Sequence, residues 1–149
     1  MREIDYKKYE NLDTVILDKH AAATIAEDCQ SFQCQLENHC AHVIMLMEQN
    51  IITKEEAGKI LKALLRLKEM GPDKIPFRPG LTDLYSNIEE WLIDELGIET
   101  GGKVHTGRSR NDMNSSVERV YTRRTILENI EAILFLMQTL LNKAEEHKE

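Results

Sequence analysis

The stretch that decides the fold is Ile126–Ala144, ILENIEAILFLMQTLLNKA. It contains no glycine or proline, and apolar residues recur every seven positions in three neighbouring registers. The registers are Leu127, Leu134 and Leu141, then Ile130, Met137 and Ala144, then Ile126, Ile133 and Leu140. A two-stranded coiled coil needs only a narrow seam, whereas this stripe is wide enough to face several helices. The pattern predicts a long helix inside a bundle.

The helical pattern continues to the end of the sequence, LNKAEEHKE, without a glycine or proline to stop it. No remaining part of the chain is apolar enough to cover the wide stripe. We therefore expect other subunits, or further sequence, to cover it, with this C-terminal helix as the contact of a homo-oligomer.

Three shorter helices are predicted upstream. The first runs from about Asp28 to Gln49 and has Phe32, Leu36, Cys40, Val43 and Met47 along one face. The second begins at Thr53, which forms a capping box with Glu56, and stops at Gly71-Pro72. The apolar residues of this second helix are Ala57, Ile60, Leu61, Leu64, Leu65 and Leu67.

The third predicted helix follows a connector, residues 71–80, which holds all three prolines of the chain. Thr82 or Asp83 caps this helix, and Gly97 closes it. No segment has the pattern of a strand. We expect an all-α fold with a helical domain over residues 1–110, then the first helix of a central bundle over 111–149, capped by Asn111 or Asp112.

Composition limits the possible classes of protein. A chain of 149 residues with 42% hydrophobic and 30% charged residues can bury a stable core. No apolar run approaches the roughly 18 residues of a membrane helix, and the start, MREIDYKKYE, has no signal core. We expect a cytoplasmic protein that does not contact a membrane.

Three cysteines, Cys29, Cys34 and Cys40, fall in the first predicted helix with His39 and His42 beside them. Cys29 and Cys34 would point about 140° apart, and Cys29 and Cys40 would be separated by about 16 Å of helical rise. No single metal ion reaches all three, and disulfides within one helix fail on the same geometry. Reduced thiols and no metal site are expected.

The segment GKVHTGRSRND, residues 102–112, differs from the rest of the chain. Residues 103–124 carry a net charge of +4, although the whole chain carries -7. The acidic remainder would repel nucleic acid, so a small anion is the better partner. Residues 102–109 differ by one residue from the phosphate-binding pattern G-x-x-x-x-G-K-[ST]. That loop follows a buried strand and carries a lysine, so nucleotide binding is not expected here.

The donors of this segment suit a small di-acid. Arg108 and Arg110 can each bind a carboxylate with two parallel hydrogen bonds, and neutral donors lie between and around them. The glycines allow a ligand to approach the backbone, and the following helix directs its N-terminal dipole at the ligand. The alternative is that the arginines pair with Asp and Glu side chains elsewhere in the protein.

Residues His105–Asp112, HTGRSRND, resemble the signature of the argininosuccinate lyases, in the fumarase and aspartase superfamily. Weaker resemblances occur in the same order as in that family. They are Ala23–Asp28 to N-S-I-x-x-D, Ala41–Leu46 to A-H-x-x-M-L, and Asp83–Glu89 to D-I-H-x-N-I-E. Together they run from about residue 22 to the end of the chain and correspond to the first third of a family member.

The resemblance implies a homotetramer whose long helices form a bundle, with active sites assembled from several subunits. It implies reversible cleavage of argininosuccinate to arginine and fumarate, without metal or organic cofactor. Ser109, Arg110, Asn111 and Thr24 would contact substrate, Asp83 would lie at the edge of the site, and His105, Thr106 and Arg108 would support the loop. The general base and acid would come from segments beyond Glu149, so the 149-residue chain alone is expected to be inactive.

The chain also departs from the family pattern. Tyr85 replaces a histidine, Met113 replaces a glutamine, Asn114-Ser115-Ser116 replaces a more apolar stretch, and a glycine-rich N-terminus is absent. Two alternatives stay open: a lyase that releases fumarate from another amino-dicarboxylate, and a catalytically silent helical module that serves assembly.

Overall fold

The computed structural model describes Thr24 and residues 28–148, apart from residues 77, 79 and 82. All regular structure in these residues is helical, which confirms the predicted all-α class. The longer helices are α2 (Phe32–Glu48), α3 (Lys54–Met70), α4 (Leu84–Leu96) and α6 (Arg110–Glu146). The shorter ones are α5 (Ile98–Gly101) and the 3-10 turns η2 (Cys29–Ser31), η3 (Pro72–Lys74) and η4 (Gly102–His105).

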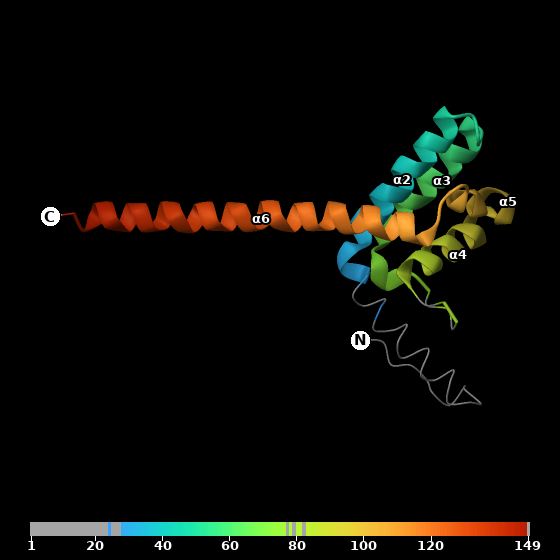
Figure 1. Ribbon diagram of the computed structural model, residues 1–149. Helices are drawn as coiled ribbons and strands as arrows, with labels where there is room; N and C mark the ends of the chain where they lie inside the picture. The colour runs from blue at the N-terminus through green and yellow to red at the C-terminus, as the bar shows by residue number, and fades with distance from the viewer. Residues whose placement is uncertain (1–23, 25–27, 77, 79, 82, 149) are drawn as a thin grey trace, which may run out of the picture.

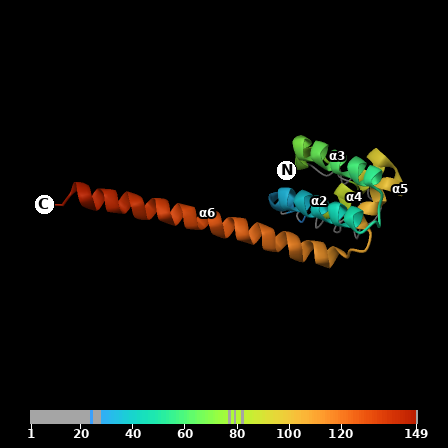
Figure 2. The same cartoon turned by 90° about the horizontal axis from the view of Figure 1, so that it is seen from above.

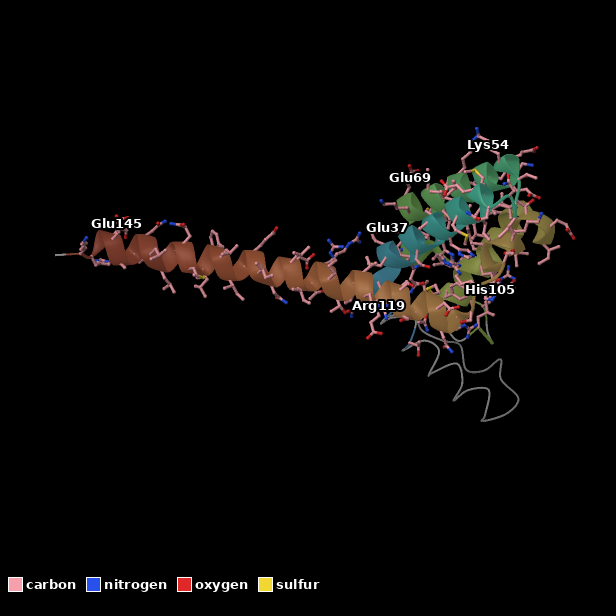
Figure 3. All side chains as sticks on the ribbon, turned by 45° about the horizontal axis from the view of Figure 1, so that its top comes forward. Glu37, Lys54, Glu69, His105, Arg119 and Glu145 are labelled. Atoms are coloured by element: carbon pink, nitrogen blue, oxygen red, sulfur yellow. The ribbon has the colours of Figure 1, made fainter. Side chains whose placement is uncertain are left out.

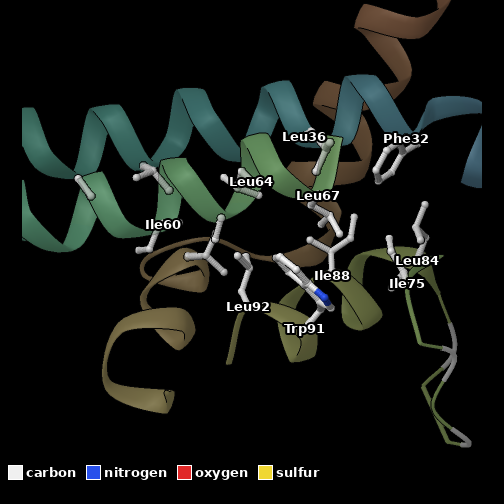
Figure 4. Packing of buried hydrophobic residues seen from close by; sticks show 14 of the residues in the cluster. Phe32, Leu36, Ile60, Leu64, Leu67, Ile75, Leu84, Ile88, Trp91 and Leu92 are labelled. Atoms are coloured by element: carbon white, nitrogen blue, oxygen red, sulfur yellow. The ribbon is translucent and has the colours of Figure 1, made fainter. Parts of the chain in front are cut away.

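The described residues 28–109 form a compact unit, which we call the head (Figures 1 and 2). Helices α2 and α3 lie side by side, and α4 packs against α3 with α5 and η4 at its end. Figure 4 shows apolar side chains of α2, α3 and α4 meeting between these helices. The fully buried members include Val43, Ala57, Ile60, Leu67, Ile88 and Leu92.

The predicted ends of α3 and α4 are confirmed. Thr53 and Glu56 form a capping box in which each side chain bonds the other residue's backbone N–H. The Asp83 carboxylate caps α4 by accepting from the backbone N–H of Ser86 at 2.8 Å. Helix α3 ends at Met70, before Gly71-Pro72. These polar contacts satisfy backbone donors that a helix start would otherwise leave without partners.

The buried face of α2 differs from the predicted one. Cys40 and Met47 are only partly buried, whereas His39 is 0% exposed and Leu46 is 1% exposed. The buried row alternates steps of four and three residues: Phe32, Leu36, His39, Val43 and Leu46. A histidine therefore occupies a position of the core that is apolar at its neighbours in the row.

Two glycines shape the approach to the HTGRSRND segment. A Cβ on Gly101 would lie 2.3 Å from the carbonyl oxygen of Leu92, so only glycine lets α5 pack this closely on α4. Gly107 has φ of +64°, a conformation that other residues rarely adopt. The short helix α5 and the turn η4, which the sequence analysis did not predict, link α4 to this segment.

Helix α6 begins two residues earlier than expected. Ser109, and not Asn111 or Asp112, is the cap: its hydroxyl accepts from the Asp112 backbone N–H while the Asp112 carboxylate accepts from the Ser109 backbone N–H. This reciprocal pair needs the Ser-x-x-Asp spacing, which places the acidic residue inside the first turn of the helix.

Beyond its first turns, α6 extends away from the head as a single helix (Figures 1 and 3). Its buried residues, Met113 and Val117, pack with Cys34 and Tyr85 of the head. The stripe from the sequence is exposed, with Leu134 57% and Leu141 63% accessible. Phe135 lies about 160° around the helix from Met137, on the side opposite the stripe, and is 76% accessible. The proposed division at residues 110 and 111 stays a prediction.

None of the helices in the described part of the chain combines the length and apolar character that crossing a membrane requires.

Candidate functional site

Arg108 points into the head. Its Nη1 donates to the Asn38 side-chain oxygen at 3.0 Å, and its Nη2 donates to His39 Nδ1 at 2.8 Å and to the Val104 carbonyl at 3.2 Å. Among the described residues, no carboxylate contacts this guanidinium. Arg108 therefore uses its donors to join the loop to α2, and its supporting role stays a prediction.

His39 and Tyr85 form the floor beneath Arg108. Their rings are stacked with centroids 5.3 Å apart and planes 3° apart, and the Arg108 guanidinium carbon lies 5.6 Å from the Tyr85 ring centre. Burial, and then the nearby Arg108 charge, lower the pKa of His39 from 6.5 to about 3. The imidazole is therefore neutral near pH 7, with Nδ1 free to accept from Arg108.

Arg110 points to the start of α4. Its Nη1 lies 3.1 Å from Asp83 Oδ2, and its Nη2 donates to Ser86 Oγ at 2.8 Å. Asp83 and Ser86 are already joined through the cap of α4, so both acceptors are fixed before they meet Arg110. The contact with Asp83 is an ion pair, and Nε–H makes no hydrogen bond to a described residue. The structure thus brings Arg110 and Asp83 together, as a neutralised pair with spare donors.

Ser109, Asn111 and Asp112 form the exposed first turn of α6. The Ser109 hydroxyl takes part in the capping box. The backbone N–H of Ser109, and then its hydroxyl, donate to the Asp112 carboxylate and lower the pKa of Asp112. The Asn111 side chain makes no hydrogen bond to a described residue, so its amide is available to a ligand.

His105 and Thr106 tie the loop to two helices. The His42 Nε2–H donates to the Thr106 carbonyl at 2.9 Å, and burial of His42 lowers its pKa. His105 Nδ1 shares a hydrogen bond with the Tyr85 hydroxyl and lies 3.5 Å from a carboxylate oxygen of Glu89. Figure 3 shows His105 on the head, beside the start of α6. Both residues thus serve the position of the loop.

The cationic segment is partly neutralised within the chain, as the open alternative held. Lys103 Nζ lies 2.5 Å from Glu56, and Arg124 Nη2 lies 2.6 Å from Glu37. Arg119 and Arg123 make no ion pair with a described residue. A hollow of about 600 Å³ lies beside Lys103 at the α2–α3 turn, but Ser109, Arg110 and Asn111 do not line it. The candidate site is therefore an open surface in the single chain.

Two other expectations concern residues away from the loop. Thr24 is a half-buried helical residue whose neighbours on both sides lie outside the described residues, so its role stays a prediction. The thiols of Cys29, Cys34 and Cys40 are free, and Cys34 is buried. Burial raises the pKa of the Cys40 thiol. In the part of the chain that the structure describes, no group of three His, Cys, Asp or Glu side chains is placed to hold a metal ion.

The sequence interpretation missed Asn38, His39 and Ser86 as neighbours of the loop. One signal was present for His39, because it lies in the row of alternating four- and three-residue steps that α2 buries. Ser86 follows the cap of α4 by three residues, where its backbone faces Asp83. Nothing in the spacing indicates that Arg108 and Arg110 turn to different helices.

Comparison with known proteins places this fold and loop in a class of enzymes. The family model described as Lyase, Lyase_1, matches residues 14–149, and the chain belongs to this family.

The relatives that it matches include argininosuccinate lyases. It is 41% identical over 128 residues to argininosuccinate lyase of Anoxybacillus flavithermus, covering 85% of this chain and 28% of the relative. It is 40% identical over 112 residues to argininosuccinate lyase 1 of Shouchella clausii, covering 75% and 22%. It is 38% identical over 122 residues to argininosuccinate lyase of Methanococcus maripaludis, covering 82% and 25%. The chain thus spans about a quarter of these relatives, less than the expected third.

Proposed function

We propose that this chain supplies part of the substrate site of a carbon–nitrogen lyase that splits argininosuccinate into arginine and fumarate without metal or organic cofactor. The observation that carries the proposal is the arrangement of Arg110. Asp83 and Ser86 hold its guanidinium at the start of α4, and the next residue, Asn111, is exposed. We propose argininosuccinate as the substrate because relatives of the chain are argininosuccinate lyases.

Arg110 is suited to bind a carboxylate without leaving Asp83. One of its five N–H donors bonds Ser86, Nη1 forms an ion pair with Asp83, and Nε–H has no hydrogen-bond partner among the described residues. A ligand carboxylate can accept from the remaining edge and from Asn111, where the N-terminal end of α6 adds positive potential. We assign Ser109, Arg110 and Asn111 to substrate contact and Asp83 to support.

The chemistry requires such donors. Removing a proton next to a carboxylate places negative charge on that carboxylate, and each well-placed donor there contributes about 3 to 4 kcal/mol in the transition state. A general base and acid are also required. We assign them to segments outside this chain, so the chain holds part of a binding site and does not turn substrate over by itself.

We further propose that α6 joins copies of the protein into a homotetramer in the cytoplasm. The exposed apolar stripe of α6 supports this, since it is wider than a two-stranded seam and the head leaves it uncovered. Other subunits would then close the open side of the site.

Calorimetric titration with argininosuccinate, arginine and fumarate tests the proposal. We expect argininosuccinate to bind more tightly than either product, and Asn111→Ala to weaken it about ten- to a hundred-fold, since a bond to a charged group is worth about 1.5–3 kcal/mol. Thr53→Ala is the control, because it removes the cap of α3 without removing a contact of residues 105–112. Unchanged affinity in Asn111→Ala would overturn the site assignment.

Two results would change the proposed function. Tighter binding of another amino-dicarboxylate would identify a lyase with a different substrate. An assembled oligomer that binds none of these ligands would indicate a silent helical module, because the apolar stripe of α6 supports assembly whether or not the loop binds anything.

A further inference from the structure

We propose that His39 is a positioning residue: by accepting a hydrogen bond from Arg108 it fixes the loop that presents Ser109, Arg110 and Asn111. Neither the loop signature nor the charge pattern assigns a role to His39. The inference rests on the proposed function only in calling this loop a binding loop, since the contact itself is independent of any ligand.

The first step is the hydrogen bond. Arginine has no acceptor, so the 2.8 Å contact requires Arg108 Nη2 to donate to a lone pair on His39 Nδ1. That fixes the ring as the neutral tautomer with its hydrogen on Nε2. A proton on Nδ1 would instead place two cations in contact inside the head.

The second step is the rigidity of His39. It is 0% exposed and lies in the buried row of α2, with its ring stacked on Tyr85. Burial and this stacking allow the ring little freedom. The acceptor that Arg108 meets is therefore fixed by the core and not by the loop.

The third step runs from Arg108 to the ligand donors. Arg108 immediately precedes Ser109, the cap of α6, and Gly107 before it has positive φ. Asn38 and Val104 hold the same guanidinium from two further sides. With Arg108 fixed, the first turn of α6 starts at one place, which sets where Arg110 and Asn111 lie relative to Asp83.

His39 Nε2 and Arg108 Nε are buried without a hydrogen-bond partner among the described residues. Two donors left without partners oppose burial. A histidine retained at this core position despite that cost is consistent with a task beyond filling space, which is the role proposed here.

Two substitutions separate the acceptor from the ring. His39→Phe keeps an aromatic ring against Tyr85 but removes the acceptor. His39→Asn places a carbonyl oxygen near the position of Nδ1 and removes the ring. We expect His39→Phe to speed exchange of the hydrogen-bonded amides of Arg108, Ser109 and Asp112 about tenfold or more, the effect of losing one charge-assisted hydrogen bond, and His39→Asn to restore slow exchange.

The same data contain the test of a purely structural role. Amides at the centres of α3 and α4 should exchange as in the unsubstituted protein, and equal acceleration throughout the head would overturn the proposal. In the Arg108→Met background, His39→Phe should change loop exchange no further. Additive effects of the two substitutions would also contradict it.

A spectroscopic measurement tests the proposal in the unsubstituted protein, so it does not depend on whether a variant folds. The ¹⁵N shifts of the His39 ring should show an unprotonated Nδ1 and a protonated Nε2, and a protonated Nδ1 would overturn the proposal outright. Loss of argininosuccinate binding with these signatures intact would contradict the proposed function alone.

Discussion

Two arginines of the loop, Arg108 and Arg110, have the same chemistry and different surroundings. Arg108 meets neutral acceptors of α2, and Arg110 meets a carboxylate and a hydroxyl of α4. The sequence predicted a cluster of anion-binding donors, but it could not indicate which arginine forms hydrogen bonds within the protein and which has donors left for a ligand. That depends on which residues other helices bring within about 3 Å, and spacing along one segment does not contain this information.

The buried His39 makes stability depend on pH. Its pKa is about 3 in the folded protein and 6.5 as an ordinary side chain, so below pH 6.5 the unfolded chain binds a proton that the folded chain does not. The contribution of His39 to the free energy of unfolding is therefore fully present above pH 6.5 and falls as the pH is lowered toward 3. We expect a slope that approaches about 1.4 kcal/mol per pH unit, measured by urea unfolding between pH 6.5 and 5.

His39→Asn is the control for that slope, because asparagine does not titrate. His42, whose pKa burial also lowers, should leave a smaller slope of the same sign in the variant. A slope that is unchanged in His39→Asn would show that His39 is already charged in the folded protein.

Gly101 is a second residue at which adding one atom should change the unfolding free energy. Gly101→Ala places a Cβ 2.3 Å from the Leu92 carbonyl, and backbone cannot move aside as a flexible side chain can. We expect a loss of roughly 1–3 kcal/mol in unfolding free energy, or more. Gly58→Ala is the matched control: it lies within α3 with nothing within 4 Å of the new Cβ, and it should stabilise by about 0.5–1 kcal/mol. Equal effects at both positions would contradict the close packing of α5.

The helices themselves were largely readable from the sequence. Thr53 with Glu56, Asp83, and Gly71-Pro72 are local signals that act within a few residues, so they could be recognised without knowing the fold. The same logic failed at α6, where Asn111 or Asp112 was expected as the cap. Ser109 is the cap because its partner Asp112 then lies three residues on, within the first turn.

The cap of α6 gives a prediction for the element as a whole. Ser109→Ala should reduce the unfolding free energy by about 1 kcal/mol and fray the first turn, because the Asp112 N–H loses its acceptor. Ser109→Thr keeps a hydroxyl and should retain most of the stability. Thermal unfolding of the two variants measures the difference, and identical melting would argue against Ser109 as the cap.

At the scale of the whole molecule, a folded head carries one long helix whose apolar stripe lies outside it (Figures 1 and 2). The heptads indicated both the helix and its need for neighbours, since apolar periodicity is a property of the segment alone. Which neighbours cover it depends on surfaces that a single chain does not contain.

We expect the chain to associate in solution through this stripe. Leu134→Glu introduces a charge at the middle of one register and should lower the mass measured by light scattering. Thr139→Glu adds the same charge outside the three registers and should leave the mass unchanged. A monomeric unsubstituted chain, or equal masses for both variants, would contradict an interface on this side of α6.

The most direct test of the account is the crystal structure of the protein with argininosuccinate bound. The account predicts a carboxylate of the ligand within hydrogen-bonding distance of the free edge of Arg110 and of the Asn111 amide, with Arg108 still on His39. A ligand bound elsewhere, with Arg110 held only by Asp83 and Ser86 and Asn111 facing solvent, would contradict it.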